Sequence, residues 1–217
     1  MKIISFDIGL RNTSICIEEY DQTIAEQIEF PAKANRYNKD GSATQEMQQS
    51  ILQMVNLGEI VLLDKKDLGE KVDYFSHDAF LNLFEWLESL HTQKYFENVH
   101  VVLLEQQLLK TNFIASAIMH NISAWFLIKF KKQFPVIFYP AKNKTRIIGQ
   151  TLKKADGSNT TKYERKKWSW QQAEIYLNHR KDEKWHTFIF KNNKKKKDDL
   201  SDVVLMNLSY MIQQRIK

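Results

Sequence analysis

Cysteine is almost missing from this sequence of 217 residues, in which Cys16 is the only one. A single cysteine excludes an internal disulfide and a zinc site built on thiolates, and it fits a reducing compartment. The six histidines show no spacing typical of metal ligands, so we assign none of them to the chemistry. Internal repeats are also missing, which excludes a repeat architecture.

The sequence also contains no recognisable targeting or membrane segment. We identify no signal peptide, no transit peptide and no apolar run of about 18 residues. The first residues, "MKIISFD", have the composition of a strand and lead directly into the domain. We therefore expect an intracellular protein without a membrane span.

The composition is that of a globular protein with a sizeable core. Hydrophobic residues make up 43% of the chain and aromatic residues 12%, which excludes a disordered protein. The length suits one large domain or a domain with insertions. Lys and Arg number 32 against 26 Asp and Glu, a net charge of +6, which permits a polyanionic partner without requiring one.

The order of the expected elements favours an α/β fold with a mixed sheet. Three short strands come first, with a tight turn near Asp21 between the second and the third. Two polar stretches, 31–75 and 141–162, are expected to be insertions, the first with a helix at 44–56. The predicted strands are 2–8, 13–20, 22–30, 99–107 and 136–140, and the other predicted helices are 77–96, 111–133, 163–180 and 199–215.

Carboxylates stand at the ends of two strands whose sequences are apolar. Asp7 closes the first strand and Glu105 closes "VVLLE". Asp199 and Asp202 share one face of the last helix, and Asp198 lies four residues before Asp202. Clustered carboxylates repel one another unless cations lie between them. Hard oxygen ligands favour magnesium or manganese, and two such ions about 3.5–4 Å apart can hydrolyse a phosphodiester.

Each acid also has a simpler interpretation. Asp7 stands two residues before Gly9 and could be an acid of a turn, and Glu105 could be a solvated strand end. Asp198 stands where the N-cap of the last helix is expected, and acids stabilise helix N-termini. Asp202 is harder to explain in this way, because apolar residues surround it in the helix. The combination of acids in this order is more informative than any one of them.

Basic and polar residues accompany the acids. The lysine run 194–197 directly precedes Asp198, and "KYERKKWSW" at 162–170 alternates basic with aromatic residues. Such residues could hold a nucleic-acid backbone and stack on bases. The run could equally be a solvated loop, and the helix an amphipathic one with a basic exposed face. Gln106 and Gln107 could contact DNA or only close their strand.

Four motifs, "FDIGLRN", "LLEQQ", "YERKK" and "KKKKDDLSDVVLM", occur in that order between residues 4 and 206. Together they resemble the motifs of the RuvC-like Holliday junction resolvases, a branch of the RNase H-like nucleases. "EQQ" with "KKDDLSD" is most similar to the poxvirus resolvases and their large-DNA-virus relatives, and the fungal mitochondrial resolvases are similar in "KKDDLxD". Relative to this pattern, 31–75 and the loop "ADGSNTTK" look extended, which affects dimer geometry and substrate preference more than chemistry.

The resemblance implies an α/β RNase H-like fold, with a mixed five-stranded sheet flanked by helices in a single domain over 1–217. It implies cleavage of four-way and other branched DNA by paired nicks, made by a homodimer with two Mg²⁺ ions, which Mn²⁺ can replace. If the protein is viral, it would act in the host cytoplasm or the virion. The implied metal ligands are Asp7, Glu105, Asp199 and Asp202, with Asp198 as a neighbour of open role. The resemblance also implies a basic residue near the active site, which would be Lys166 or Lys167, and Lys166 is the predicted catalytic one. The implied DNA contacts are Arg11, Gln106, Gln107, Arg165, Lys166, Lys167, Lys194, Lys195, Lys196 and Lys197.

Three other functions compete with this one. Actin-like sugar kinases also run a first strand into an Asp-x-Gly turn, but they need two such domains and usually well over 300 residues, whereas this sequence has 217. A branched-DNA-binding protein without catalysis would be expected to have lost some of the acids. Another RNase H-like nuclease, acting on flaps or RNA, would retain all of them.

Overall fold

The computed structural model describes residues 1–69, 77–107, 112–150 and 158–216. The chain divides into two compact units, and each is described by itself below. Unit 1 comprises 1–19 and 60–140, and unit 2 comprises 20–59 and 141–217. The predicted loop "ADGSNTTK" lies partly outside the described residues, as do the end of the proposed insertion 31–75 and an internal part of the proposed insertion 141–162. The single domain over 1–217 stays a prediction.

Unit 1 is built on a five-stranded sheet with the order β3-β2-β1-β4-β5. Strand β1 pairs antiparallel with β2 and parallel with β4, and β4 pairs parallel with β5. The sheet is therefore mixed, which confirms the predicted fold class. The strands are β1 (Lys2–Asp7), β2 (Thr13–Tyr20), β3 (Gly58–Lys66), β4 (Val101–Glu105) and β5 (Val136–Tyr139).

The predicted strand at 22–30 is wrong. The segment begins with a short helix, α1 (Gln22–Ala25), whose N-cap Asp21 accepts a hydrogen bond from the Ile24 backbone N–H at 3.0 Å. Ala25 and Ile28 are buried and lie three residues apart, a helical rather than an alternating spacing. The third strand of the sheet is β3, which lies within the stretch predicted to be polar and irregular.

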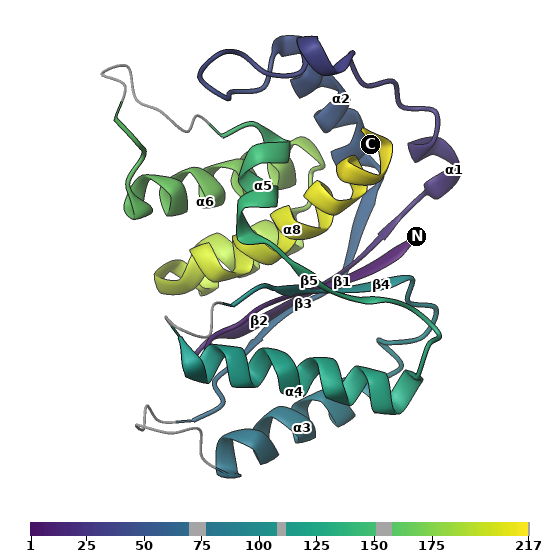
Figure 1. Ribbon diagram of the computed structural model, residues 1–217, viewed down its shortest axis with the longest axis vertical. Coiled ribbons are helices and arrows are strands. Elements are labelled where there is room, and N and C mark those ends of the chain that lie inside the picture. The colour runs from purple at the N-terminus through teal and green to yellow at the C-terminus, as the bar shows by residue number, and fades with distance from the viewer. Residues whose placement is uncertain (70–76, 108–111, 151–157, 217) are drawn as a thin grey trace. The chain divides into compact units, whose positions relative to one another are not determined.

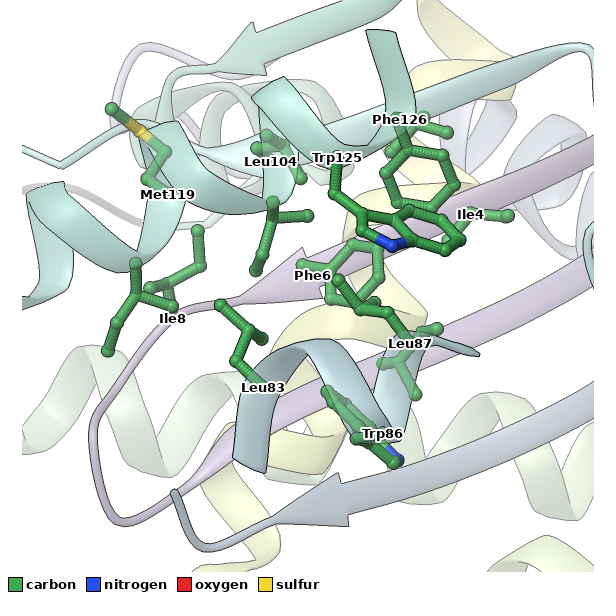
Figure 2. Close-up of a cluster of buried hydrophobic side chains, with 14 of the residues drawn as sticks. Ile4, Phe6, Ile8, Leu83, Trp86, Leu87, Leu104, Met119, Trp125 and Phe126 are labelled. Carbon is green, nitrogen blue, oxygen red and sulfur yellow. The ribbon is translucent and has the colours of Figure 1, made fainter. Parts of the chain in front are cut away.

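Helices α3 (His77–Thr92) and α4 (Phe113–Phe130) lie along one face of this sheet (Figure 1). Between them and the sheet is the main apolar core of unit 1, part of which Figure 2 shows. The ring of Phe6 on β1 meets Trp86 of α3 and Phe126 of α4 edge-on, with centroids 6.3 and 5.9 Å apart. Such edge-to-face contacts stabilise aromatic pairs beyond the area they bury, so they help to fix β1 under both helices.

Helix α4 corrects one expectation from the sequence. By length and composition it is apolar enough to cross a membrane, although no apolar run of that length was identified. The core helix of a globular unit meets the same criteria. Ile118, Met119, Ile122 and Phe126 of α4 are all buried and belong to the core cluster of unit 1. The apolar composition of α4 is thus explained at least in part by packing against the sheet.

Unit 2 is helical, and α8 (Lys197–Arg215) is its central element (Figure 1). Helices α2, α5 and α6 pack against α8, which explains why apolar residues surround it on most sides. Besides α1, the other helices of unit 2 are α2 (Gln45–Asn56), α5 (Ala141–Ile148), α6 (Lys162–His179) and α7 (Glu183–Thr187), with short turns of other helix types at Lys33–Asn35, Phe188–Asn192 and Lys194–Lys196.

Helix α5 lies where the sequence predicts a polar insertion. Its residues Lys144, Ile147 and Ile148 are buried. They are three and four positions apart, so they share one helix face, and this face packs on α8. Predictions for the remaining helices are confirmed with shifts of a few residues at their ends.

Candidate functional site

Unit 1 brings Asp7 and Glu105 side by side. Asp7 is the last residue of β1, and Glu105 is the last residue of β4. These strands are parallel neighbours, with Phe6 opposite Leu104, so the next residues on each are Asp7 and Glu105. Neighbouring strands are about 4.8 Å apart, and residues at matching positions point to the same face. Two half-buried carboxylates therefore stand together at the carboxyl end of the sheet.

The two glutamines after Glu105 have specific partners. The Gln106 backbone N–H donates to the Tyr139 carbonyl at 2.9 Å, which continues the pairing of β4 with β5. The Gln107 side-chain amide donates to Glu105 Oε2 at 3.3 Å. Gln107 thus restrains the Glu105 carboxylate, a role that the sequence did not suggest. DNA contacts by either glutamine stay a prediction.

Arg11, another predicted DNA contact, follows β1 in unit 1. Its Nε donates to Asp67 Oδ2 at 2.8 Å, and both side chains are about half exposed. Exposed ion pairs of this kind contribute little to stability. The guanidinium has further N–H groups, so the pair leaves a phosphate contact open as a prediction.

Unit 2 holds the other acids, at the start of α8. Asp202 Oδ2 forms an ion pair with Lys144 Nζ of α5 at 2.8 Å, and Asp202 Oδ1 accepts a hydrogen bond from the Ser169 hydroxyl of α6. Asp198 accepts a hydrogen bond from Lys166 of α6. Two lysines from two helices therefore compensate the charge of these aspartates. The Lys144 side chain is only 7% exposed and that of Asp202 19%, so their pair is largely shielded from water.

The aspartates differ in their protonation. Burial, with the adjacent charge of Asp198, raises the pKa of Asp199 from 3.8 to about 6. Burial would also raise the pKa of Asp198, but its hydrogen bond and attraction to Lys166 outweigh this and lower it. Burial opposes the charge on Lys166, yet the bond to Asp198 and the nearby acids raise its pKa. Burial and the charge of Asp198 therefore disfavour ionised Asp199 more than Lys166 and Lys196 favour it.

The interpretation of Asp198 as an N-cap is wrong. Helix α8 begins at Lys197, and its N-cap position is Lys196, which makes no side-chain capping bond. Asp198 lies in the first helical turn instead, and its side chain is directed to Lys166. The sequence placed the helix start two residues too late, because the lysine run was taken to be outside the helix.

The predicted basic residues of unit 2 lie in varied surroundings. Lys194, Lys195 and Lys196 are exposed in a short 3₁₀ turn, whereas Lys197 Nζ lies over the Trp170 ring, 3.3 Å from its centroid. On α6, Arg165, Lys166 and Lys167 are exposed, and so is Tyr163. Further along α6, Ser169, Ala173, Tyr176 and Leu177 are buried. At 100° per residue these four lie on the same side of the helix as Arg165 and Lys166, whereas Lys167 points away from them. Nucleic-acid contacts by the basic residues of α6 stay a prediction.

Lys144 and Ser169 are residues of this region that sequence reasoning missed. Lys144 stands in "YPAKNKTRIIG", and the spacing of Ile147 and Ile148 from it was the available signal for a buried lysine on a helix. The sequence gave no indication that Ser169 contacts an acid, because a serine between two tryptophans has no specific pattern.

The donors suit a hard divalent cation. Asp7 and Glu105 in unit 1, and Asp199 and Asp202 in unit 2, offer only carboxylate oxygens, which Mg²⁺ and Mn²⁺ prefer. Within the described parts of the chain, no three Asp, Glu, His or Cys side chains gather into a ready-made ion site. Two carboxylates on adjacent strands and a half-buried aspartate with a raised pKa fit such an ion by their chemistry.

No protein-family model matches the sequence, and a search of curated proteins finds no match. Solved structures do match. The fowlpox virus resolvase in complex with Holliday junction DNA is 20% identical with a TM-score of 0.55, and the alignment covers 100% of both chains. A second structure of the fowlpox virus Holliday junction resolvase is 17% identical, with a TM-score of 0.54 and 99% of each chain covered. The yeast mitochondrial Holliday junction resolvase is 15% identical, with a TM-score of 0.51, 99% of this chain and 81% of its own covered.

The chain has the fold of the Holliday junction resolvases. This likeness, together with the mixed five-stranded sheet, confirms the α/β RNase H-like fold expected from the motifs. The resolvase fold also extends over nearly all of this chain, so the resemblance read from four short motifs holds for the architecture as a whole. At these identities the likeness concerns the fold, and the activity of this chain is a separate question.

Proposed function

We propose that this chain is a Mg²⁺-dependent endonuclease that resolves four-way DNA junctions by paired nicks, acting as a homodimer. The observation that carries the proposal is the juxtaposition of Asp7 and Glu105 at the carboxyl ends of two parallel strands of a resolvase fold. Two carboxylates at neighbouring strand ends repel each other, and a divalent cation held between them would relieve that repulsion. A cation-dependent reaction on a polyanion explains both the acids and the basic residues around the second set of acids.

The residues that would bind cations are Asp7 and Glu105 in unit 1 and Asp199 and Asp202 in unit 2, each pair as its own unit presents it. When bound by carboxylates, Mg²⁺ supplies Lewis-acid stabilisation of phosphoryl oxygens and lowers the pKa of water. The protein groups have complementary tasks. Gln107 orients the Glu105 carboxylate, and Ser169 orients that of Asp202.

Lys144 and Lys166 contribute to the site through their positive charge. Each ammonium already compensates an aspartate in unit 2, at Asp202 and Asp198 respectively. An ammonium beside a carboxylate limits the repulsion that a DNA phosphate would meet there. Lys166 is about half exposed and can reach a phosphate directly, whereas the buried Lys144 is suited to holding Asp202 in place.

A direct comparison of substrates tests the proposal. The protein is incubated with a four-way junction, a flap and an RNA–DNA hybrid, each with Mg²⁺ and with EDTA. We expect Mg²⁺-dependent, symmetrically paired nicks in the junction, with 5′-phosphate and 3′-hydroxyl ends. Preferential cleavage of the flap or the hybrid would assign the fold to another nuclease reaction, and binding without any cleavage would indicate a structure-binding protein.

A further inference from the structure

A cavity in unit 2 has a strongly one-sided charge. It has a volume of about 360 Å³ and lies beside α5, next to the 3₁₀ turn Lys33–Asn35 and the last turn of α8. Three cationic side chains line it, and none of its described lining residues is acidic. The lining residues that matter here are Lys33, Arg36, Tyr37, Asn143, Arg146 and Gln213. Three cations without an anion repel one another, which indicates a site for an anionic ligand.

Arg36, one of the residues that line the cavity, is held in place by backbone carbonyls. Arg36 Nε donates to the Pro31 carbonyl and its Nη1 to the Ile216 carbonyl, both at 2.9 Å. These bonds use two of the roughly five N–H groups of a guanidinium, so the others are available to a ligand. The Tyr37 hydroxyl donates to the Ile147 carbonyl at 2.8 Å, which ties the same segment to α5. Arg36 is therefore a preorganised donor, and a preorganised donor loses little entropy when it binds.

The cavity is distinct from the aspartates of the same unit, although one helix serves both. Lys144 of α5 pairs with Asp202, whereas Arg146 lines the cavity. Residues two positions apart on an α-helix are rotated by about 200° around its axis, so the side chains of Lys144 and Arg146 leave α5 on nearly opposite sides. Lys33 and Arg146 are both exposed and can extend from the cavity toward solvent.

We propose that this cavity binds a backbone phosphate of DNA, as an anchoring point separate from the carboxylates. A phosphodiester is a tetrahedral monoanion whose oxygens suit the fork of Arg36 and the amides of Asn143 and Gln213. Lys33 and Arg146 at the exposed rim would meet neighbouring phosphates, which only a polymeric anion supplies. Through α5, the strand held here is fixed relative to Lys144 and Asp202. The inference rests on the proposed function, since it assigns a DNA contact to a junction nuclease.

The first test is the salt dependence of junction binding. Lys33→Gln/Arg146→Gln removes two rim charges and spares Arg36, whose bonds hold the segment together. The matched control, Lys39→Gln/Lys191→Gln, removes two exposed charges of unit 2 that do not line the cavity. In EDTA, we expect the slope of log K against log salt to fall by about 2 for the rim variant and to stay unchanged for the control. Equal slopes for the rim variant, the control and the wild type would overturn the proposal.

The second test uses the unaltered protein, so it does not depend on the folding of a variant. Phenylglyoxal modifies accessible arginines, and mass spectrometry reports the modification of Arg36 and Arg146 with and without junction DNA. We expect the junction to protect Arg146, and inorganic phosphate at low millimolar concentration to protect it less. Modification of Arg146 at the same rate with and without a bound junction would also overturn the proposal. These outcomes differ from a failure of the proposed function, in which the wild-type protein would not cut the junction at all.

Discussion

Lys144 and Asp202 form an ion pair that joins α5 to α8, with Nζ and Oδ2 2.8 Å apart and both side chains mostly buried. The Ser169 hydroxyl holds the second oxygen of the same carboxylate. Asp202 is therefore fixed from two neighbouring helices. A carboxylate held in this way has a fixed orientation, which suits a preorganised ligand, and a cation bound there would share it with the Lys144 ammonium.

Breaking this pair from the lysine side should be costly. Lys144→Met leaves Asp202 charged and shielded from water, and we expect the free energy of unfolding to fall by about 3 kcal/mol. The double variant Lys144→Met/Asp202→Asn should lose less than the sum of the two single variants, by about 2 kcal/mol. Urea denaturation measures all four proteins. Lys142→Met, at an exposed position of the same helix, is the control and should change little, and additive losses would show that the pair is not coupled.

The two adjacent aspartates should respond to pH in opposite ways. The pKa of Asp199 is raised to about 6, so the folded state binds its proton more tightly than the unfolded state does. Its contribution to stability is full below about pH 4 and is lost as the pH rises through about 6. In EDTA, Asp199→Asn should therefore increase the Tm at pH 7–8 but not at pH 4.

Asp198→Asn is the matched comparison for this pH series. The pKa of Asp198 is lowered, since Lys166 holds its charged form, so its contribution is present above about pH 4 and lost on acidification. Asp198→Asn should lower the Tm at pH 7, where Asp199→Asn raises it. The same direction of change for both variants at pH 7 would contradict the assignment of these two environments.

DNA cleavage assays should distinguish the roles of Asp199 and Asp198. Asp199 shares the i, i+3 face of α8 with Asp202, whereas Asp198 is engaged by Lys166. We expect Asp199→Asn to be nearly inactive in single-turnover cleavage at saturating Mg²⁺, and Asp198→Asn to keep most of its activity. The i, i+4 relation of Asp198 to Asp202 would allow the reverse. An inactive Asp198→Asn beside an active Asp199→Asn would move the metal ligand to Asp198.

The 3₁₀ turn Lys194–Lys196 should contribute to DNA affinity through its positive charge alone. Lys194, Lys195 and Lys196 are exposed, while Lys197 lies over Trp170 and is left unchanged in the test. Replacing the three exposed lysines with Ala should reduce the salt slope of junction binding by up to about 3, because fewer counterions are released. Replacing Lys39, Lys132 and Lys191 instead, three exposed lysines outside this turn, is the control. A slope equal to that of the control would make this run a solvated turn.

The sequence predicted the parts of the fold that depend on local pattern. Asp7 and Glu105 were placed correctly at strand ends, because apolar runs closed by an acid are distinctive. Strand β3 was missed since it lies in a polar stretch, and its identity depends on pairing with β2, a partner distant in sequence. The strand predicted at 22–30 was wrong, because a helical turn capped by Asp21 forms there instead.

Within the candidate site, the sequence found the acids and missed what holds them. Lys144 and Gln107 act through contacts made by folding, Lys144 across two helices and Gln107 back onto its own strand end. No spacing rule links Lys144 to Asp202, which are far apart in the chain. The start of α8 was misplaced for a related reason, since a lysine run is a poor guide to a helix boundary and Asp198 was taken for its cap.

The central claim, that a carboxylate at the end of β1 serves a Mg²⁺-dependent reaction on branched DNA, is tested most directly by Asp7→Asn. Cleavage of a four-way junction is measured with Mg²⁺ for the wild type, Asp7→Asn and a control, Asp78→Asn, which changes an exposed acid of unit 1. Junction affinity is measured in EDTA for the same proteins. We predict that Asp7→Asn binds the junction normally, because phosphate contacts dominate affinity, and makes no nicks, while the control cuts like the wild type. Near-normal cleavage by Asp7→Asn would contradict the account.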